Sequence, residues 1–400
     1  MRARQAAAQI SPPIWRILTH SFIFGLAASF ADVLFNFYLV SLGYRADVAG
    51  LMSTIFRIAG VVLGLPIGIL IDRVGSRRAV MIGAVTYGAA WALVLVSEPI
   101  WLLGATYFMA GAANILTLTA VVPLLTGVTP QANRPAIFGY NAFAALVVGL
   151  LGSAIGGALP AVVGGALRVD PQATVAYRGA LMSVVALGLL AIIPLLRGIP
   201  EERRIDRAAA ASPSDGRALG RRELLMLAIP ALTLGVGGGL ILPFQNLFFR
   251  QQFGMSDAAV GVTLGWAAVG MGVGALLGSP ASQRLGMQRA AALLRLGTVP
   301  AMLLMLVPVL PIAGFGFLMR GLFVAASFPL MDALTMTIVP PRQRGTAVSL
   351  TSVSWSLGWA ASAAVSGWIQ IHLGFGPVIV AAIVAYGASG LAIWWLRIER

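Results

Sequence analysis

The sequence predicts an all-α polytopic membrane protein of twelve transmembrane helices, arranged as two six-helix bundles related by pseudo-two-fold symmetry. Of its 400 residues, 59% are hydrophobic and only 10% are charged, whereas soluble domains carry roughly 25% charged residues. Apolar runs of membrane-spanning length recur along the whole chain. Small and polar positions also repeat between its two halves.

Twelve apolar runs approach or exceed the roughly 20 residues that a helix needs to span a bilayer. Several are long enough to require tilt, and membrane helices tolerate the glycine and proline inside them. The expected spans are 14–40, 48–71, 79–97, 100–127, 136–161, 177–196, 223–249, 257–280, 288–310, 314–339, 346–371 and 374–396.

A polar segment separates the first six runs from the last six. Residues 197–223 are charged and contain Pro, Gly and Ser, a composition typical of a solvated linker. We therefore expect an N-terminal six-helix bundle at 1–196, a cytoplasmic linker at 197–223 and a C-terminal six-helix bundle at 224–400. A lateral amphipathic helix within the linker is the alternative.

The formal net charge of +14 rests on arginine, because the chain contains no lysine. The arginines concentrate in short loops on one side of the spans, while the other side holds Arg45, Arg168, Arg178 and Arg250. Positive loops mark the cytoplasmic face. Both termini are therefore expected in the cytoplasm, with the chain in a bacterial plasma or inner membrane. No basic face with interleaved aromatics indicates a nucleic-acid partner.

The sequence lacks the residues that several classes of protein need for their function. The chain has no cysteine, which excludes disulfides and thiolate chemistry. His20 and His372 offer no metal-ligand spacing, and the glycine-rich stretches lack the G-K-[ST] of a P-loop. No paired carboxylates or His-centred triad indicate an enzyme. We expect no catalytic residue, no metal and no cofactor.

Several positions of the first half recur in the second half at one constant spacing. The pairs are Gly43 and Gly254, Gly50 and Gly261, Arg73 and Arg284, and Gly75 and Gly286, with Pro130 and Pro340, and Arg134 and Arg344, one residue closer. This pattern suggests a duplicated six-helix unit. Parallel repeats of this kind are typical of transporters whose halves rock about a central site.

The most specific pattern follows the second expected span, in "GLPIGILIDRVGSRRAV" at 64–80. Gly68 permits a close helix approach, and Gly75 permits a tight turn. Asp72 ends a helix beside several arginines, where its carboxylate needs cationic or N–H partners. The pattern positions are Gly68, Leu70, Asp72, Arg73, Gly75, Arg77 and Arg78.

These residues resemble the signature of the major facilitator superfamily, G-x-L-x-D-R-x-G-x-R-R. The resemblance implies that Asp72 caps the N-terminus of the eleventh helix, near Gly345 and Thr346, and latches the cytoplasmic side shut. The alternative is that the arginines only set topology. In the second copy, Arg284 and Gly286 remain, but Gln283 replaces the aspartate.

Two further patterns of that family are incomplete. Residues 152–157, "GSAIGG", are close to the antiporter signature G-P-x-x-G-G, but Ser153 stands in place of the proline. The fourth span lacks the mid-membrane arginine common in drug exporters, and Tyr107 lies near its place. Both departures weigh against drug/proton antiport.

The ionisable residues assigned to the interior of spans are Asp32, Arg57, Arg320 and Asp332. Each costs roughly 2.5–3.5 kcal/mol at a helix centre, so such charges usually face a partner or an aqueous cavity. Asp32 and Arg57 lie at similar depth on adjacent antiparallel spans, with Asn36 one turn from Asp32. We hypothesise an ion pair that lines the central cavity, with Asp32 as the proton carrier. A permanent structural pair is the alternative.

Asp332 and Arg320 share the tenth span. Asp332 could serve in one of two roles: as a proton carrier, or as a structural gate residue that pairs with Arg284. Arg320 fits a contact with an anionic substrate group, or a partner across the cavity. Other polar cavity candidates are Asn114, Tyr140, Asn141, Gln245, Asn246, Ser354 and Trp355. Taken singly, each of these also fits a hydrogen bond between helices.

Two local features refine these candidates. Pro243 is expected to loosen the seventh span beside Gln245 and Asn246. Trp355 and Trp359 lie one turn apart and form a candidate aromatic wall.

Together these features favour a monomeric, proton-coupled secondary transporter that moves a small organic solute across the bilayer by alternating access. Export of an amphipathic compound is slightly favoured, because the spans are apolar and cavity charges few. Proton-coupled uptake of a metabolite, anionic in view of Arg57 and Arg320, is the alternative. An assembly factor or sensor of the same architecture, without transport, is the alternative of another class.

Overall fold

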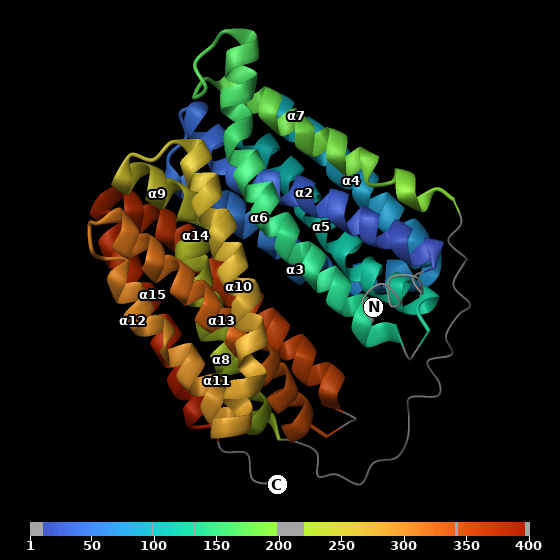
Figure 1. The fold of residues 1–400 in the computed structure, drawn as a ribbon, viewed down its shortest axis with the longest axis vertical. Coiled ribbons are helices and arrows are strands. Elements are labelled where there is room, and N and C mark those ends of the chain that lie inside the picture. The colour runs from blue at the N-terminus through green and yellow to red at the C-terminus, as the bar shows by residue number, and fades with distance from the viewer. Residues whose placement is uncertain (1–10, 98, 131–132, 198–219, 341–342, 397–400) are drawn as a thin grey trace, which may run out of the picture. The chain divides into compact units, whose positions relative to one another are not determined.

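The structure, a computed structural model, describes residues 11–97, 99–130, 133–197, 220–340 and 343–396. In these ranges the chain is almost entirely helical and carries no strand (Figure 1). Its contacts define two compact units: unit 1 contains 1–38 and 62–205, and unit 2 contains 39–61 and 206–400. Residues 198–219 of the expected linker lie outside the described ranges.

Unit 1 contains most of α2, the second part of α3, and the helices up to residue 195. Their bounds are α2 (Pro12–Ser41), α3 (Ala46–Val74), α4 (Ser76–Val96), α5 (Ile100–Val128), α6 (Arg134–Leu167), α7 (Thr174–Leu190) and the 3-10 turn η2 (Ile193–Leu195).

Unit 2 contains the end of α2, the first part of α3 and all helices after the linker. Their bounds are α8 (Arg221–Ile241), η4 (Leu242–Phe244), α9 (Gln245–Phe253), α10 (Asp257–Leu285), α11 (Met287–Leu296), α12 (Thr298–Leu304), α13 (Leu310–Ile338), α14 (Arg344–Leu373) and α15 (Phe375–Trp394).

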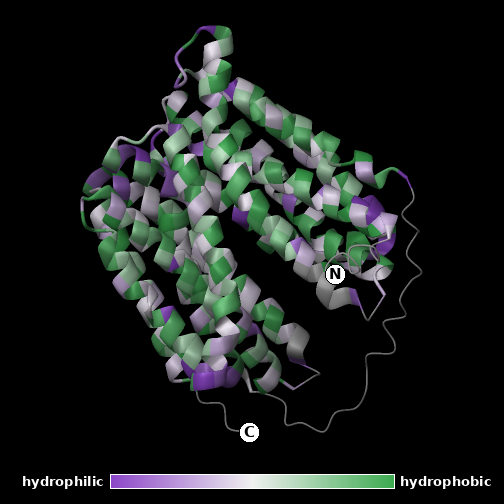
Figure 2. Ribbon diagram, viewed as in Figure 1, coloured by the Kyte–Doolittle hydropathy of each residue, from purple (hydrophilic) through white to green (hydrophobic). Residues whose placement is uncertain are grey.

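The helices follow the expected spans closely. Ten helical segments of the described residues are long and apolar enough to cross a membrane, and Figure 2 shows apolar residues along most of their length. Two further expected spans fall outside those ten. The span at 288–310 is divided into α11 and α12, and α14 covers 346–371 with a hydroxyl-rich sequence.

Prolines explain where two spans are interrupted. Pro243 lies in η4, which divides the seventh span into α8 and α9, as the sequence predicts. Pro300 follows the division between α11 and α12. A proline has no N–H to donate to the preceding turn, and its ring crowds that turn, so the regular helix is broken there.

The repeated glycines have matching backbone roles in the two units. Gly75 precedes α4 with φ 86°, and Gly286 precedes α11 with φ 79°. Gly43 and Gly254 likewise have positive φ, at 86° and 63°. This conformation is open to glycine at little cost, so the tight turn expected at Gly75 is confirmed and recurs in the second repeat.

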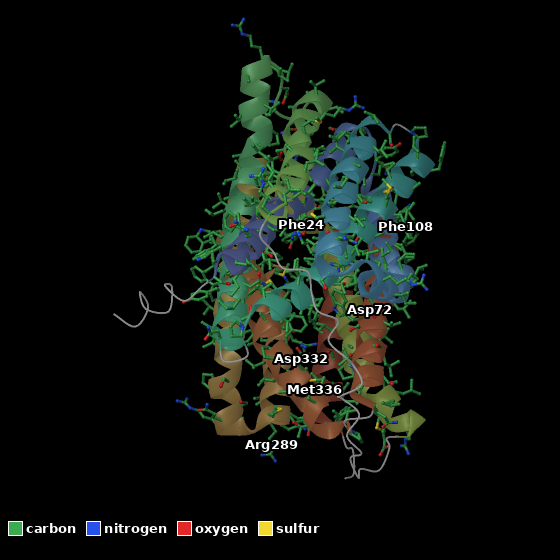
Figure 3. The ribbon with its side chains drawn as sticks, turned by 90° about the vertical axis from the view of Figure 1, so that its right-hand side faces the viewer. Phe24, Asp72, Phe108, Arg289, Asp332 and Met336 are labelled. Atoms are coloured by element: carbon green, nitrogen blue, oxygen red, sulfur yellow. The ribbon has the colours of Figure 1, made fainter. Side chains whose placement is uncertain are left out.

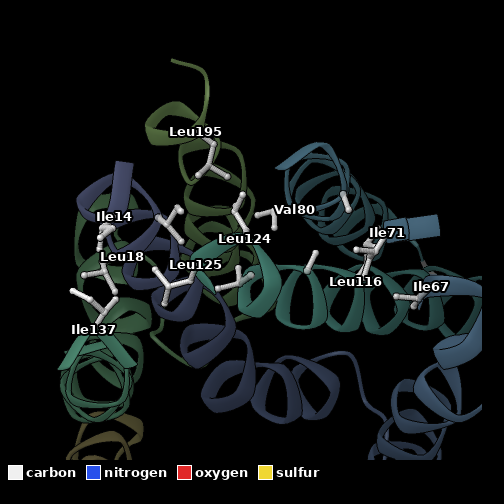
Figure 4. Close-up of a cluster of buried hydrophobic side chains, with 14 residues drawn as sticks. Ile14, Leu18, Ile67, Ile71, Val80, Leu116, Leu124, Leu125, Ile137 and Leu195 are labelled. Carbon is white, nitrogen blue, oxygen red and sulfur yellow. The ribbon is translucent and has the colours of Figure 1, made fainter. Parts of the chain in front are cut away.

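The core of unit 1 lies where α2, α3, α4, α5, α6 and η2 meet (Figure 4). Ile14, Ile71, Leu124 and Leu195 are among its buried members. In the same unit α4 packs against α5 and α7 (Figure 1). Burial of these side chains removes them from contact with lipid and fixes the helices of this half by close packing.

In unit 2, α14 packs against α8 through glycine. A side chain added at Gly235 or Gly239 would collide with the backbone of α14, and one at Gly358 would collide with the backbone of α8. Small residues allow membrane helices to approach this closely. The contact sets the spacing of two helices that wall the pocket described next.

Candidate functional site

A pocket of about 460 Å³ lies within unit 2 between α8, α11, α13 and α14. Its volume is in the range of small-molecule sites, roughly 300–1,000 Å³. Its apolar wall consists of Leu227, Pro230, Ala231, Leu234, Phe328 and Met331. Its polar lining consists of Arg295, Asp332, Thr335, Thr351, Ser352, Trp355 and Ser356. A mostly apolar wall with few polar groups is typical of a ligand site.

Asp332 supplies the acidic group of this pocket. It lies on α13, one turn before Met336 (Figure 3), and its side chain is exposed. Asp332 and Arg284 both belong to the described residues, and no ion pair joins them in this structure. The carboxylate therefore lines the pocket without the partner that the gate hypothesis assigns to it.

Arg295 supplies the basic group, from α11. Its side chain is only 2% exposed. Nε and one terminal nitrogen donate to Ser327 Oγ at 3.0 and 2.8 Å, and the other terminal nitrogen donates to Ser389 Oγ at 2.9 Å. The serines come from α13 and α15, so three helices position this guanidinium.

The sequence reasoning missed Arg295. It lies inside the expected span at 288–310, yet among the arginines only Arg57 and Arg320 are assigned to the interior of spans from the sequence. The structure corrects this, because Arg295 is buried on the inner face of α11. The available signal was its position in the run "AALLRLG", with apolar residues on both sides.

Trp355 connects the pocket to Arg57. The Arg57 guanidinium carbon lies 5.0 Å from the centre of the Trp355 ring and 4.3 Å from that of Trp359. The two indole rings are 5.2 Å apart. The aromatic wall expected from their spacing is therefore present, and the cation lies over its face. All three residues belong to unit 2.

The first part of α3 packs closely against α14 in unit 2. Thr54 donates to the Ala360 carbonyl at 2.6 Å, and Trp359 Nε1 donates to Ser53 Oγ at 3.3 Å. A side chain at Gly50 would meet the Ala363 carbonyl, and one at Gly367 would meet the backbone of Ala46. This helix pair is therefore held by small residues as well as by hydrogen bonds.

Arg320 lies apart from the pocket lining. It is 2% exposed, donates to the Tyr386 hydroxyl at 3.1 Å, and lies 5.0 Å from the centre of the Phe317 ring. Its Nε has no hydrogen-bond partner among the described residues. The structure thus surrounds Arg320 with protein, whereas Arg295 lines the pocket.

The candidates of unit 1 are spread over several helices. Asp32 is exposed on α2, and Asn36, one turn later, is 8% exposed. Asn114 on α5 has a buried Oδ1 without a hydrogen-bond partner in the described structure. Tyr140 is exposed and Asn141 half-buried, both on α6. Asp32 and Arg57 belong to different units, so their pairing stays a prediction.

The other candidates of unit 2 lie off the pocket. Asn246 on α9 is buried, and its Oδ1 accepts from the Leu247 backbone N–H at 2.9 Å, while Gln245 is half-buried. Ser354 is half-buried on α14, on a different face from the pocket residues 351, 352, 355 and 356.

In the loop motif, Arg77 has a defined role. Its Nε donates to the Leu195 carbonyl at 3.0 Å and a terminal nitrogen donates to Leu196 at 2.8 Å. Asp72, Arg73 and Arg78 are exposed, as is Arg284 in the second copy. Among the described residues of unit 1, no other helix comes within 4 Å of a Cβ built at Gly68, so the close helix approach expected there stays a prediction. The latch role of Asp72 stays a prediction.

Repeated helical halves, membrane-spanning helices and an internal pocket with isolated charges define a polytopic membrane protein of the transporter class. The family model of the major facilitator superfamily matches residues 17–307 and 227–400, and the chain belongs to this family of transporters.

Relatives of known sequence agree. An uncharacterised MFS-type transporter of Burkholderia mallei is 27% identical over 382 residues, which cover 92% of this chain and 87% of that protein. The uncharacterised MFS-type transporter YfkF of Bacillus subtilis is 25% identical over 122 residues, 30% of this chain and 31% of that protein.

Solved structures share the fold. A bacterial homologue of the iron transporter ferroportin, in an inward-facing state, matches with a TM-score of 0.75 at 14% identity, covering 96% of this chain and 98% of that chain. The nucleoside transporter NupG matches with a TM-score of 0.70 at 13% identity, with the same coverage. At these identities the likeness describes the fold alone.

Proposed function

We propose that this chain is a secondary active transporter that carries a small organic solute by alternating access, coupled to protons. The supporting observation is the pocket of unit 2, in which Asp332 and Arg295 face a largely apolar wall. The moving halves are 1–196 and 224–400, joined by the linker at 197–223. The protein works as a monomer in a bacterial plasma or inner membrane, with both termini in the cytoplasm.

Asp332 is the leading proton carrier of this proposal. A carrier needs a group that gains and loses a proton, and arginine stays protonated, so neither Arg295 nor Arg57 qualifies. Asp332 lines the pocket and is without an ion pair to Arg284 in the described structure. Asp32, the other acid assigned to the interior of an expected span, is the second carrier candidate, paired with Arg57.

The contact between the first part of α3 and α14 supplies a step for alternating access. In a rocking cycle this contact forms when one side of the membrane is closed and separates when that side opens. Its glycines and hydroxyls suit repeated docking, because they give close packing without a large buried charge. Asp72 is proposed to act in the same cycle, as the latch on the cytoplasmic side.

Export of an amphipathic compound fits the apolar wall of Leu227, Leu234 and Met331. Uptake of an anionic metabolite is the second candidate, favoured by the cation at Arg295. A sensor or assembly factor without transport is the candidate of another class. This non-transporting alternative predicts that no solute causes proton flux, whichever direction the gradient has.

The test is solute-dependent proton flux in proteoliposomes that contain the purified full chain and an interior pH dye. We expect flux with a subset of a solute library, and its loss in Asp332→Asn while solute binding persists. Asp170→Asn, in an exposed loop, is the matched control and should behave as the unmodified protein. Full flux in Asp332→Asn would remove Asp332 as the carrier. Absence of flux with every solute would favour the non-transporting class.

A further inference from the structure

The hydrogen bonds around Arg295 hold its guanidinium in one orientation. Ser327 Oγ donates its own proton to the Val324 carbonyl at 2.7 Å, and Ser389 Oγ donates to the Pro230 carbonyl at 2.8 Å. Each hydroxyl has one proton and two acceptor lone pairs. Because both protons are committed to backbone carbonyls, the lone pairs are left to accept from Arg295. The cation is therefore preorganised by its surroundings.

The same partners leave the charge of Arg295 uncompensated. Both acceptors are neutral hydroxyls, and the Phe328 ring, 5.9 Å from the guanidinium carbon, is a neutral aromatic neighbour. No carboxylate lies within ion-pair distance of Arg295 in the described part of the chain. A buried cation without a counter-charge is costly, and an anionic ligand would offset that cost.

The guanidinium also has donors to spare. It carries five N–H groups, of which three donate to the two serines. One N–H on each terminal nitrogen is therefore available, and Arg295 lines the pocket. Charge-assisted hydrogen bonds from guanidinium to carboxylate are short and strong, and they are directional.

The rest of the pocket indicates what the anionic group is attached to. Trp355 and Phe328 supply aromatic surface, and Leu234 and Met331 supply apolar surface. Asp332 places a negative charge elsewhere in the lining. An anionic head group is thus attracted to Arg295 and repelled from Asp332, which orients the apolar body along the wall.

We propose that Arg295 is the substrate-binding cation of this pocket and that the solute is an organic anion of the carboxylate class with an apolar or aromatic body. This assignment rests on the transport function proposed above and names the substrate class of its site. It moves the anion contact from Arg57 and Arg320 to a residue of α11 that three helices hold in place.

The test uses probes that share a body and differ in charge. Phenylacetate, phenylacetamide and phenethylamine are negative, neutral and positive at neutral pH, and the indole series of indole-3-acetate, indole-3-acetamide and tryptamine repeats the comparison on a larger ring. Binding to the purified full chain is measured by isothermal calorimetry and by ligand-induced thermal shift. We expect the acids to bind at least about tenfold more tightly than the amides, the size expected for one charge-assisted contact.

Variants then assign the preference to Arg295. Arg295→Gln should lose the acid-over-amide preference, and Arg295→Lys, which keeps the charge but not the fork, should keep part of it. Arg289→Gln is the matched control, because Arg289 lies exposed at the start of the same helix (Figure 3) and outside the pocket lining. Its preference should equal that of the unmodified protein.

Several results would overturn the assignment. The first is that amides bind the unmodified protein as tightly as acids, and the second is that no acid binds it. The third is that the Arg295→Gln variant folds and keeps an unchanged preference for acids over amides. The first two need no variant, so the test holds even if Arg295→Gln does not fold. The same probes are added to the proteoliposomes of the proton-flux assay. Proton flux with amides or amines but not with acids would contradict the assignment of an anionic substrate while leaving the transport function standing. No flux with any probe or any solute of the library would contradict the transport function as well.

Discussion

Arg77 and Gln288 perform the same structural task in the two repeats. Arg77 donates to the Leu195 and Leu196 carbonyls at the end of the last span of the first half. Gln288 donates to the Ile393 and Leu396 carbonyls, both at 2.9 Å, at the end of the last span of the second half. Each stands two residues after a turn glycine with positive φ, Gly75 or Gly286. The terminal carbonyls of a helix need such donors.

This equivalence predicts how substitutions at Arg77 affect stability. Arg77→Gln should cost little stability, because glutamine serves the same carbonyls in the second repeat. Arg77→Ala should destabilise the protein by about 1–3 kcal/mol, since it removes a charged donor from partly buried acceptors. The measurement is reversible unfolding in mixed micelles, with Arg289→Ala as the control. Equal losses for Arg77→Gln and Arg77→Ala would contradict a capping role that glutamine can fill.

The contact of Gly50 with α14 predicts a packing defect in a larger variant. Gly50→Ala places a methyl group against the Ala363 carbonyl, and overpacking of this kind costs about 1–3 kcal/mol. Transport should slow several-fold, because the first part of α3 no longer docks on α14. Gly64→Ala on the same helix is the control, since its added methyl group has no neighbour within 4 Å. Equal transport rates in the two variants would show that this contact is not part of the cycle.

The stacking of Arg57 on Trp359 predicts an energetic coupling between the two residues. A double-mutant cycle with Arg57→Met and Trp359→Leu should give a coupling of about 0.5–2 kcal/mol. The measurement is unfolding free energy, repeated for transport rate. A second cycle with Arg57→Met and Asp32→Asn tests the ion pair that the sequence predicts. Coupling to Asp32 without coupling to Trp359 would favour the ion pair over the aromatic contact.

The burial of Arg320 against Tyr386 predicts a structural role. Tyr386→Phe removes the hydroxyl that accepts from Arg320, and should destabilise the protein by about 1–3 kcal/mol. Arg320→Met should be nearly neutral or stabilising, because a buried charge is replaced by an apolar side chain of similar length. Transport should persist in Arg320→Met. Loss of transport at unchanged stability would instead support the substrate contact inferred from the sequence.

The helices could be predicted because the length of an apolar run is a local property of the sequence. Each expected span coincides with a helix or a broken pair of helices in the structure, with ends that differ by a few residues. The turn at Gly75 and the interruption at Pro243 also follow from local backbone chemistry, since glycine alone adopts positive φ at little cost and proline lacks an N–H. The family resemblance of the 64–80 loop is confirmed by the family match over the whole chain.

The candidate site was less predictable, because a side chain's environment depends on helices far away in the sequence. Arg320 and Arg295 are both arginines in apolar surroundings, yet Tyr386 covers one and the pocket reaches the other. Ser354 lies between pocket residues in the sequence but on another face of α14. The structure places two indole rings beside Arg57, a contact that the sequence did not predict, while the expected pairing of Arg57 with Asp32 stays a prediction.

By itself, the sequence determined that this is a helical membrane protein of the major facilitator type, with repeated halves and marked turns. Hydropathy, glycine and proline act over one helix or one turn, so they can be read in order along the chain. Only the tertiary structure decided that Arg295, held by Ser327 and Ser389, joins Asp332 in one pocket. That decision depends on how five helices pack, because the pocket lies between α8, α11, α13 and α14 and Ser389 belongs to α15. Close packing is set by the shapes of side chains that meet only in the folded protein.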